Sequence, residues 1–232
     1  MKTYVLIPAR GGSRGIFRKN IAPLFGKPLI AWTIEQALQI NEIDRVIVST
    51  EDSEIAEIAR QYGAETPFVR PAELASDTAN GMDVLVHCAR WLQEEEAYQA
   101  DYLFELPVTT PLRTDEDILA TLEVARTYSA DIVVGVTPVA EHPYWVRRID
   151  ENHRLQPFIA DTPAIARRQD LPDACALNGA VYMIRVDTLL NHDAKSDKTY
   201  PVVMPRDNSI DINTPFDLRL AEFMLQQRDN AD

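Results

Sequence analysis

The chain has 232 residues, of which 46% are hydrophobic and 25% are charged. These fractions are typical of a globular protein and exclude a disordered or fibrous one, and the length suffices for one large domain with a real core. Acidic side chains outnumber basic ones by 36 to 23, which gives a formal net charge of −13. Proteins that bind nucleic-acid polymers or anionic membranes through charge are usually basic, so we expect neither as a partner.

The sequence contains no evident secretion signal or membrane span. The first apolar run, residues 4–8, is stopped by Arg10, and no run approaches the roughly 18 apolar residues of a membrane helix. We therefore expect a cytoplasmic protein. Cys88 and Cys175 are too few for a disulfide framework or a four-cysteine zinc site, and we expect each to be a small buried apolar residue.

Short apolar runs alternate with amphipathic stretches along much of the chain. Continuous apolar runs predict buried strands, and apolar residues three and four positions apart predict helices. The expected strands span residues 4–7, 45–49, 102–106, 132–136, 180–184 and 202–204, with a short extended piece at 66–69. The expected helices span residues 29–38, 53–62, 82–92, 114–128 and 214–226. This alternation predicts an α/β layer fold with a mostly parallel sheet.

The helical period disappears between residues 138 and 178, where five prolines occur. A connection of about 40 residues is too long for an ordinary loop inside a compact domain. The segment also carries Tyr144, Trp145, Phe158 and Ile159, which are costly in water but natural at an interface. We therefore divide the chain into an α/β domain, residues 1–137 and 179–232, and an inserted extended arm, residues 138–178, that mediates dimerisation.

The loop after the first expected strand combines glycines with positive charge. Residues 10–19 hold four basic side chains and three glycines in an otherwise acidic chain. Glycines let backbone N–H groups approach a ligand closely, and the carboxyl end of a strand is where α/β sheets bind ligands. The loop therefore predicts a phosphate-rich ligand, although a solvated loop with accidental charge is the alternative. The signatures G-x-x-x-x-G-K-[ST] and G-x-G-x-x-G are both absent, which disfavours P-loop ATPases and dinucleotide-binding folds.

Beyond this loop, eight stretches together resemble one known family. They are residues 7–20, 26–30, 45–50, 70–78, 109–113, 168–172, 178–182 and 209–212. In these stretches the chain resembles the acylneuraminate cytidylyltransferases, or CMP-sialic acid synthetases, with their legionaminate and pseudaminate relatives. The resemblance implies a Rossmann-like sheet of the nucleotide-diphospho-sugar transferase type and a homodimer that exchanges an arm. It also implies that CTP is joined to the anomeric hydroxyl of a nine-carbon 2-keto-3-deoxy sugar acid, which gives a CMP-sugar and pyrophosphate with Mg²⁺.

The resemblance also assigns candidate site residues. Arg10, Lys19 and Asp211 match catalytic positions: Arg10 would hold the triphosphate and Lys19 the α-phosphate, while Asp211 pairs with Asn213 at the metal. The candidate substrate-binding residues are Gly11, Gly12, Ser13, Arg14, Asn20, Arg70, Asp77, Ala79, Arg168, Gln169 and Asn178. Arg168 and Gln169 are the candidates for the sugar carboxylate. Capping of a helix or turn remains the alternative for Asn20 and Asp77.

Three departures from the family pattern bear on the sugar and the metal. Asn213 stands where the family's metal pair has a second aspartate, and residues 211–214 are alternatively a strand end and a helix cap. Pro107 stands where a glutamine commonly holds the sugar, and Leu177 precedes Asn178 where some members carry arginine. The departures leave the nucleotidyl-transfer class intact and the sugar open. The alternatives are transfer to another acidic keto sugar and a non-catalytic nucleotide-binding homologue.

Overall fold

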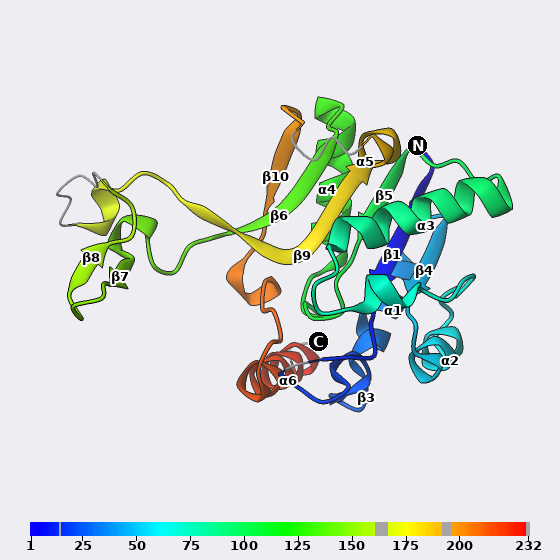
Figure 1. The fold of residues 1–232 in the computed structure, drawn as a ribbon, viewed down its shortest axis with the longest axis horizontal. Helices are drawn as coiled ribbons and strands as arrows, with labels where there is room; N and C mark the ends of the chain where they lie inside the picture. Colours follow the sequence, from blue (N-terminus) through cyan, green and yellow to red (C-terminus); the bar gives the residue numbers. More distant parts are fainter. Residues whose placement is uncertain (14, 161–166, 192–195, 231–232) are drawn as a thin grey trace.

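A six-stranded sheet forms the centre of the computed structural model (Figure 1). The structure describes residues 1–13, 15–160, 167–191 and 196–230, and for residue 168 it describes the backbone only. The strands of the sheet run in the order β10-β6-β9-β5-β1-β4. Their bounds are β1 (Thr3–Pro8), β4 (Arg45–Ser49), β5 (Tyr102–Glu105), β6 (Ile132–Pro138), β9 (Cys175–Arg185) and β10 (Thr199–Val203). Strand β9 is antiparallel to both β5 and β6, and the other neighbouring pairs are parallel. The predicted mostly parallel α/β sheet is confirmed.

Helices cover both faces of this sheet. One face carries α1 (Leu29–Gln39), α2 (Ser53–Gln61), α4 (Asp115–Tyr128) and α6 (Pro215–Asp229), and the other carries α3 (Gly81–Glu96) and α5 (Val186–Leu190). The shorter elements are β2 (Pro23–Leu24), β3 (Lys27–Pro28), β7 (Arg147–Ile149) and β8 (Leu155–Pro157), with 3-10 turns η1 (Lys19–Ile21), η2 (Ala72–Ala75), η3 (Pro143–Trp145), η4 (Arg168–Asp170) and η5 (Arg206–Asn208). Within the described ranges, no helix is long and apolar enough to cross a bilayer.

Strand β1 shows why the sheet lies between two helical layers. Tyr4 and Leu6 pack toward α3, whereas Val5 and Ile7 pack toward α1 and α2, and all four side chains are buried. A strand buried on both faces reads as a continuous apolar run in the sequence. The carboxyl ends of β1, β4 and β5 lie at one edge of the sheet because these strands are parallel, and the loops that leave this edge form the site.

Every expected strand of the sheet and every expected helix is present, and one local expectation about secondary structure is wrong. Residues 66–69 form no regular secondary structure, and the preceding Glu65 bridges to Ile47 of β4. Helix α5 was not expected, because its five residues are too few to show a helical period in the sequence. Cys88 is buried as expected, but Cys175 is exposed, because it begins β9 where that strand pairs with the outer end of β6 at Pro138.

The arm leaves the domain between the paired ends of β6 and β9. Figure 1 shows its β7–β8 hairpin extending well away from the central sheet. Ile149, Leu155 and Phe158 are each about two-thirds exposed there, at 69%, 71% and 66%. The hairpin therefore presents apolar side chains that nothing in the described part of the same chain covers. The division into domain and arm, and the role of the arm in dimerisation, stay predictions.

Candidate functional site

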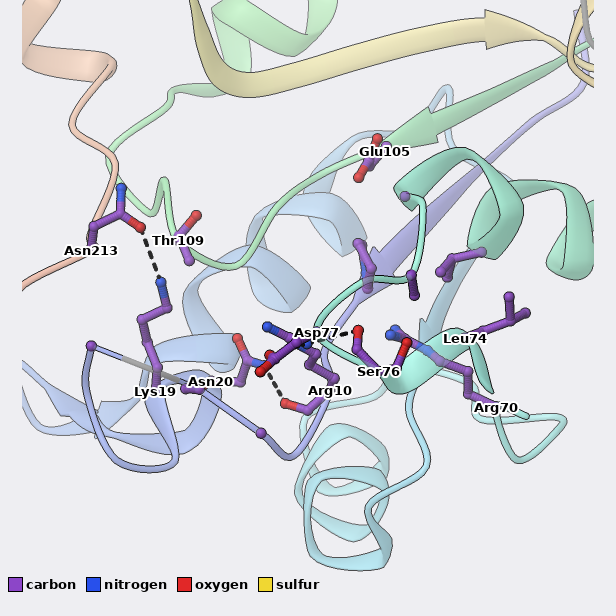
Figure 2. Close-up of a pocket in the computed structure, with 17 residues that line it drawn as sticks. Arg10, Lys19, Asn20, Arg70, Leu74, Ser76, Asp77, Glu105, Thr109 and Asn213 are labelled. Carbon is purple, nitrogen blue, oxygen red and sulfur yellow. Dashed lines mark hydrogen bonds and ion pairs between the residues drawn. The ribbon is translucent and has the colours of Figure 1, made fainter. Parts of the chain in front are cut away.

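A cavity of about 440 Å³ opens at the carboxyl ends of β1 and β5 (Figure 2). Four parts of the chain that are far apart in the sequence build it: the glycine loop after β1, the segment from Arg70 to the start of α3, the end of β5 with the residues that follow, and Asn213. Nine of the predicted site residues line it: Arg10, Gly12, Ser13, Lys19, Asn20, Arg70, Asp77, Ala79 and Asn213. The structure therefore brings together in one place most of the nucleotide-binding set that was predicted from the sequence.

Four predicted residues do not line this cavity: Gly11, Gln169, Asn178 and Asp211. Gln169 lies in η4 on the arm. Asn178 is buried in β9, where its amide donates to Ser209 Oγ at 2.9 Å and accepts from the Ala180 N–H at 3.0 Å. These bonds tie the Asn178 amide to Ser209 and to its own strand, and its role in substrate binding stays a prediction. Arg14 and the side chain of Arg168 lie outside the described residues.

The glycine loop is held by contacts that only small residues permit. The Gly11 N–H donates to Glu51 Oε1 at 2.7 Å, so this amide is already satisfied by a carboxylate. A Cβ atom on Gly15 would lie 2.2 Å from the Asn213 carbonyl oxygen. A side chain at residue 15 would therefore force the loop away from Asn213, and glycine is what allows the two segments to meet.

Arg10 connects the glycine loop to the segment on the opposite wall. Its Nη1 donates to the Ser76 carbonyl at 2.9 Å and lies 2.9 Å from Asp77 Oδ1. Asn20 fixes the backbone at the same point, since its Nδ2 donates to the Arg10 carbonyl at 2.8 Å. Asn20 thus shapes the loop through this hydrogen bond, and Asp77 pairs with a cation at the cavity; neither caps a helix among the described elements.

Lys19 lies at the other end of the cavity, against the chain segment that leads into α6 (Figure 2). Its Nζ donates to the Ile212 carbonyl at 2.8 Å and lies 3.4 Å from Asn213 Oδ1. Partial burial lowers the pKa of Lys19, an effect that the Asp211 carboxylate opposes and the Arg10 charge reinforces. The ammonium group is therefore partly desolvated, which strengthens its interaction with an anion.

Arg70 is the most buried cation of the cavity, with 4% of its surface exposed. Its Nε donates to Ser49 Oγ at 3.0 Å, and a second nitrogen donates to the Ser49 carbonyl. Burial lowers the pKa of Arg70 to about 10, and the charge of Glu51 partly offsets that effect. These bonds fix the Arg70 guanidinium group against the end of β4, in a cavity that Asp77 and Ala79 also line.

Arg18, the fourth basic residue of the loop, belongs to a different set of contacts. Its Nη2 lies 3.0 Å from Asp52 Oδ1 and 2.9 Å from Glu54 Oε2, at the start of α2. Arg18 therefore forms ion pairs with two carboxylates outside the cavity and does not line it. The count of basic residues in the sequence therefore overstates the charge that a bound phosphate meets.

The proposed metal pair lies at the edge of the cavity. Asn213 donates from Nδ2 to Asp211 Oδ2 at 2.7 Å, and its amide oxygen faces Lys19. The helix cap of α6 is Thr214, which forms a capping box with Asp217. Among the described residues, no group of three or more His, Cys, Asp or Glu could enclose a metal ion. Mg²⁺ is commonly held by one or two carboxylates together with substrate phosphates, and the exposed Asp211 beside a phosphate-binding cavity fits that pattern.

Sequence reasoning missed several lining residues, of which three are polar: Ser76, Glu105 and Thr109. Glu105 and Thr109 lie at or just after the end of β5. The sequence contains a signal for Glu105 in particular. Glu105 is an acidic residue at the carboxyl end of a predicted buried strand, which is the place where an α/β sheet puts functional groups. Burial raises the pKa of Glu105 to about 7.

Together these features define an α/β protein with a cavity lined by arginine and lysine side chains at the carboxyl edge of its sheet. Residues 4–147 match the family model described as Cytidylyltransferase. The chain belongs to the cytidylyltransferase family and is a nucleotidyltransferase. This confirms the family assignment made from the sequence.

Individual relatives agree with this membership over the whole chain. It is 33% identical to the CMP-N,N'-diacetyllegionaminic acid synthase of Legionella pneumophila, across 100% of this chain and 99% of that protein. It is 34% identical to the pseudaminic acid cytidylyltransferase of Campylobacter jejuni, across 97% and 96% of the two chains. A solved CMP:2-keto-3-deoxy-manno-octonic acid synthetase in complex with CTP shares the fold, with a TM-score of 0.72 at 20% identity over 98% of this chain and 100% of that one.

Proposed function

We propose that this protein joins CMP from CTP to the anomeric hydroxyl of a nine-carbon 2-keto-3-deoxy sugar acid, with release of pyrophosphate. The observation that carries the proposal is the convergence of Arg10, Lys19 and Arg70 on one cavity, in a chain that matches legionaminate and pseudaminate enzymes end to end. A triphosphate needs such concentrated positive charge, and the acidic surface of the rest of the chain does not supply it.

In the proposed reaction the sugar hydroxyl oxygen forms a bond to the α-phosphorus of CTP, and the bond from that phosphorus to the β-phosphate oxygen breaks. The leaving pyrophosphate takes the electron pair of the broken bond, and the hydroxyl proton passes to solvent or a nearby base. Catalysis of this step is mostly positioning and charge stabilisation. Arg10 and Lys19 stabilise the charge that develops on the phosphates, while Arg70 and Asn20 hold the nucleotide end and the loop.

We propose Mg²⁺ as the metal that the reaction uses. Asp211 would hold it together with phosphate oxygens of the substrate, and the bound ion would neutralise phosphate charge. Asn213 contributes less than an aspartate would, because its amide oxygen carries no net charge and faces Lys19.

The acceptor-sugar side of the site departs from the family pattern at Pro107. Pro107 has no side-chain hydrogen-bonding group, so it cannot hold a sugar as the glutamine common at this position does. This substitution is the specific observation in favour of another acidic keto sugar as acceptor. Arg168 and Gln169 remain the proposed partners of the sugar carboxylate, and they would have to reach it from the arm.

We also propose that two copies of the chain associate through the arm. The exposed Ile149, Leu155 and Phe158 supply an apolar surface that association would cover. Sedimentation at micromolar concentration should give the mass of a dimer, and a deletion of the β7–β8 hairpin should give a monomer. A wild-type chain that sediments as a monomer would contradict this part of the proposal.

The proposed location is the cytoplasm, because the substrate CTP is made and used there. Cell fractionation with an antibody against the protein tests this location, and recovery in a membrane or secreted fraction would contradict it.

The decisive experiment for the function is pyrophosphate release from CTP with Mg²⁺ and a panel of legionaminic, pseudaminic, sialic and shorter acidic keto sugars. Turnover with a nine-carbon acid is the expected result. Turnover with a shorter acid alone would favour the other-sugar alternative. Tight CTP binding without turnover of any acid would favour a non-catalytic nucleotide-binding homologue and refute the proposal.

A further inference from the structure

Glu105 is an acidic residue in an otherwise apolar strand. It ends β5, where its register partners are Leu6 on β1 and Tyr182 on β9. Side chains alternate along a strand, and Phe104 packs in the core on the α1 face while Leu103 packs toward α3. Glu105 therefore lies on the α3 face of the sheet. On that face the cavity opens, and Figure 2 shows Glu105 on the opposite side of the cavity from Arg10.

No residue in the described part of the chain forms a hydrogen bond or ion pair with the Glu105 carboxyl. The three cations of the cavity are engaged elsewhere: Arg10 with Asp77, Lys19 with the Ile212 carbonyl, and Arg70 with Ser49. Burial alone raises the pKa of Glu105, with no nearby cation to oppose the shift. Glu105 is partly exposed, and it lines the cavity. A partly desolvated carboxyl gains from a hydrogen-bond donor, and a ligand in the cavity can supply the donor that the described chain does not.

We propose that Glu105 is a substrate-contacting residue on the side of the cavity opposite Arg10, where its carboxyl accepts a hydrogen bond from a neutral donor group of a bound substrate. This inference rests on the proposed function. The cationic side of the cavity attracts phosphates, whereas a carboxyl repels them. Glu105 therefore favours the part of a ligand that carries hydroxyl or amino groups. A bound nucleotide or sugar is then oriented with its phosphates toward the cationic side and its hydroxyl or amino groups toward Glu105.

Both proposed substrates, CTP and the sugar acid, can supply such a donor, and Glu105 has neighbours on the sides proposed for each of them. Ala79, Gly81 and Val84 line the cavity near the start of α3, in the same segment as Arg70, which is proposed to hold the nucleotide. Tyr182 is the titratable neighbour on β9, and its pKa is raised by burial and by the charges of Glu105 and Asp211. That neighbourhood extends toward the proposed metal residue, where the acceptor sugar must approach the α-phosphate. The experiment therefore measures the nucleotide and the sugar separately.

The test compares Glu105→Leu and Glu105→Gln with the wild-type protein. Leucine removes every acceptor atom and suits the apolar strand, whereas glutamine keeps an acceptor oxygen without the charge. Glu57→Gln, at an exposed position on α2, is the matched control. Calorimetric titration with CTP alone measures nucleotide binding, and the KM of the sugar acid at saturating CTP measures acceptor binding. Thermal unfolding reports whether each variant folds.

We expect Glu105→Leu either to lower the CTP affinity or to raise the KM of the sugar acid, in each case about ten- to hundredfold. This is the effect of losing one hydrogen bond to a charged group. Glutamine should have a smaller effect, and Glu57→Gln none. The melting temperature of Glu105→Leu should not fall, because no native bond is lost. A changed CTP affinity assigns the donor to the nucleotide, and a changed KM with unchanged CTP affinity assigns it to the sugar.

The inference is overturned if both quantities stay within about twofold of wild type, or if both Glu105 variants lose activity only in proportion to a lowered melting temperature. If the wild-type protein turns over no sugar acid, the proposed function fails. In that case the CTP titration alone decides the role of Glu105.

Discussion

Replacement of Lys19 by alanine tests the phosphate-binding role of the loop after β1. The folded protein loses one hydrogen bond, from Lys19 Nζ to the Ile212 carbonyl at 2.8 Å, and a weaker contact to Asn213. A bond of this kind contributes about 1 kcal/mol net, which corresponds to a fall in melting temperature of roughly 2–4 °C for a chain of this size. The fold should therefore survive the change.

Turnover should fall far more than stability. Loss of one preorganised charge contact to the reacting group typically costs ~2.7–4 kcal/mol, or about 10² to 10³ in rate. The assay is pyrophosphate release at saturating CTP and sugar acid, paired with thermal unfolding. Lys198→Ala, at an exposed position before β10, is the control and should leave both quantities unchanged. Near-normal turnover in Lys19→Ala would refute the phosphate assignment, and a melting temperature lowered in proportion to the activity would show that Lys19 is structural.

The remaining predictions concern Arg10, the metal site at residue 213 and the carboxyl of Glu105. Arg10→Ala should lower turnover about 10²- to 10³-fold while the protein stays folded; near-normal turnover would remove Arg10 from the site. Asn213→Asp should lower the Mg²⁺ concentration needed for half-maximal rate, because a second carboxylate would lie beside Asp211; an unchanged midpoint in a magnesium titration would exclude residue 213 from the metal site. Glu105 keeps a proton in the folded state between about pH 4.5 and 7 that the unfolded chain has lost. Its ionisation therefore destabilises the fold as the pH rises through this window, by up to roughly 3 kcal/mol. Urea unfolding at pH 5 and pH 7.5 should show this loss in wild type relative to Glu105→Leu, and equal pH dependence of the two proteins would contradict it.

The parts of the fold that depend on local chemistry were predictable. Strand β1 is apolar on both faces, and that run of residues is visible in the sequence. Helix α4 begins at Asp115, directly after its N-cap Thr114, and Asp117 completes a capping box. The helix expected over residues 114–128 agrees with these bounds to within one residue. Such features depend on neighbours in the chain, so the sequence pattern specifies them directly.

The parts that depend on partners distant in sequence were not predictable from the pattern. The four basic residues of the loop were counted together as its positive charge, but α2 folds beside Arg18 and supplies Asp52 and Glu54. The hydrogen bond from Asn178 to Ser209 was likewise not foreseeable, because Ser209 comes within hydrogen-bonding distance only after β9 pairs with β6. In each case a side chain's partner is set by tertiary packing, which neither residue type nor local spacing encodes.

The geometry of Arg10 explains how the cavity can be organised before a ligand arrives. Both of its contacts, to Ser76 and Asp77, use the single nitrogen Nη1. A guanidinium carries five N–H donors, and within the described chain the other nitrogens of Arg10 form no hydrogen bond. A phosphate can therefore bind the free side of Arg10 while Asp77 continues to hold the side chain in place. The Gly11 amide, by contrast, is already bonded to Glu51, so the backbone of this loop can offer its N–H groups to a phosphate only beyond that residue. Charge held in position before binding is what lowers the barrier of a phosphoryl-type transfer, and in this loop the arginine, more than the first glycine amide, meets that requirement.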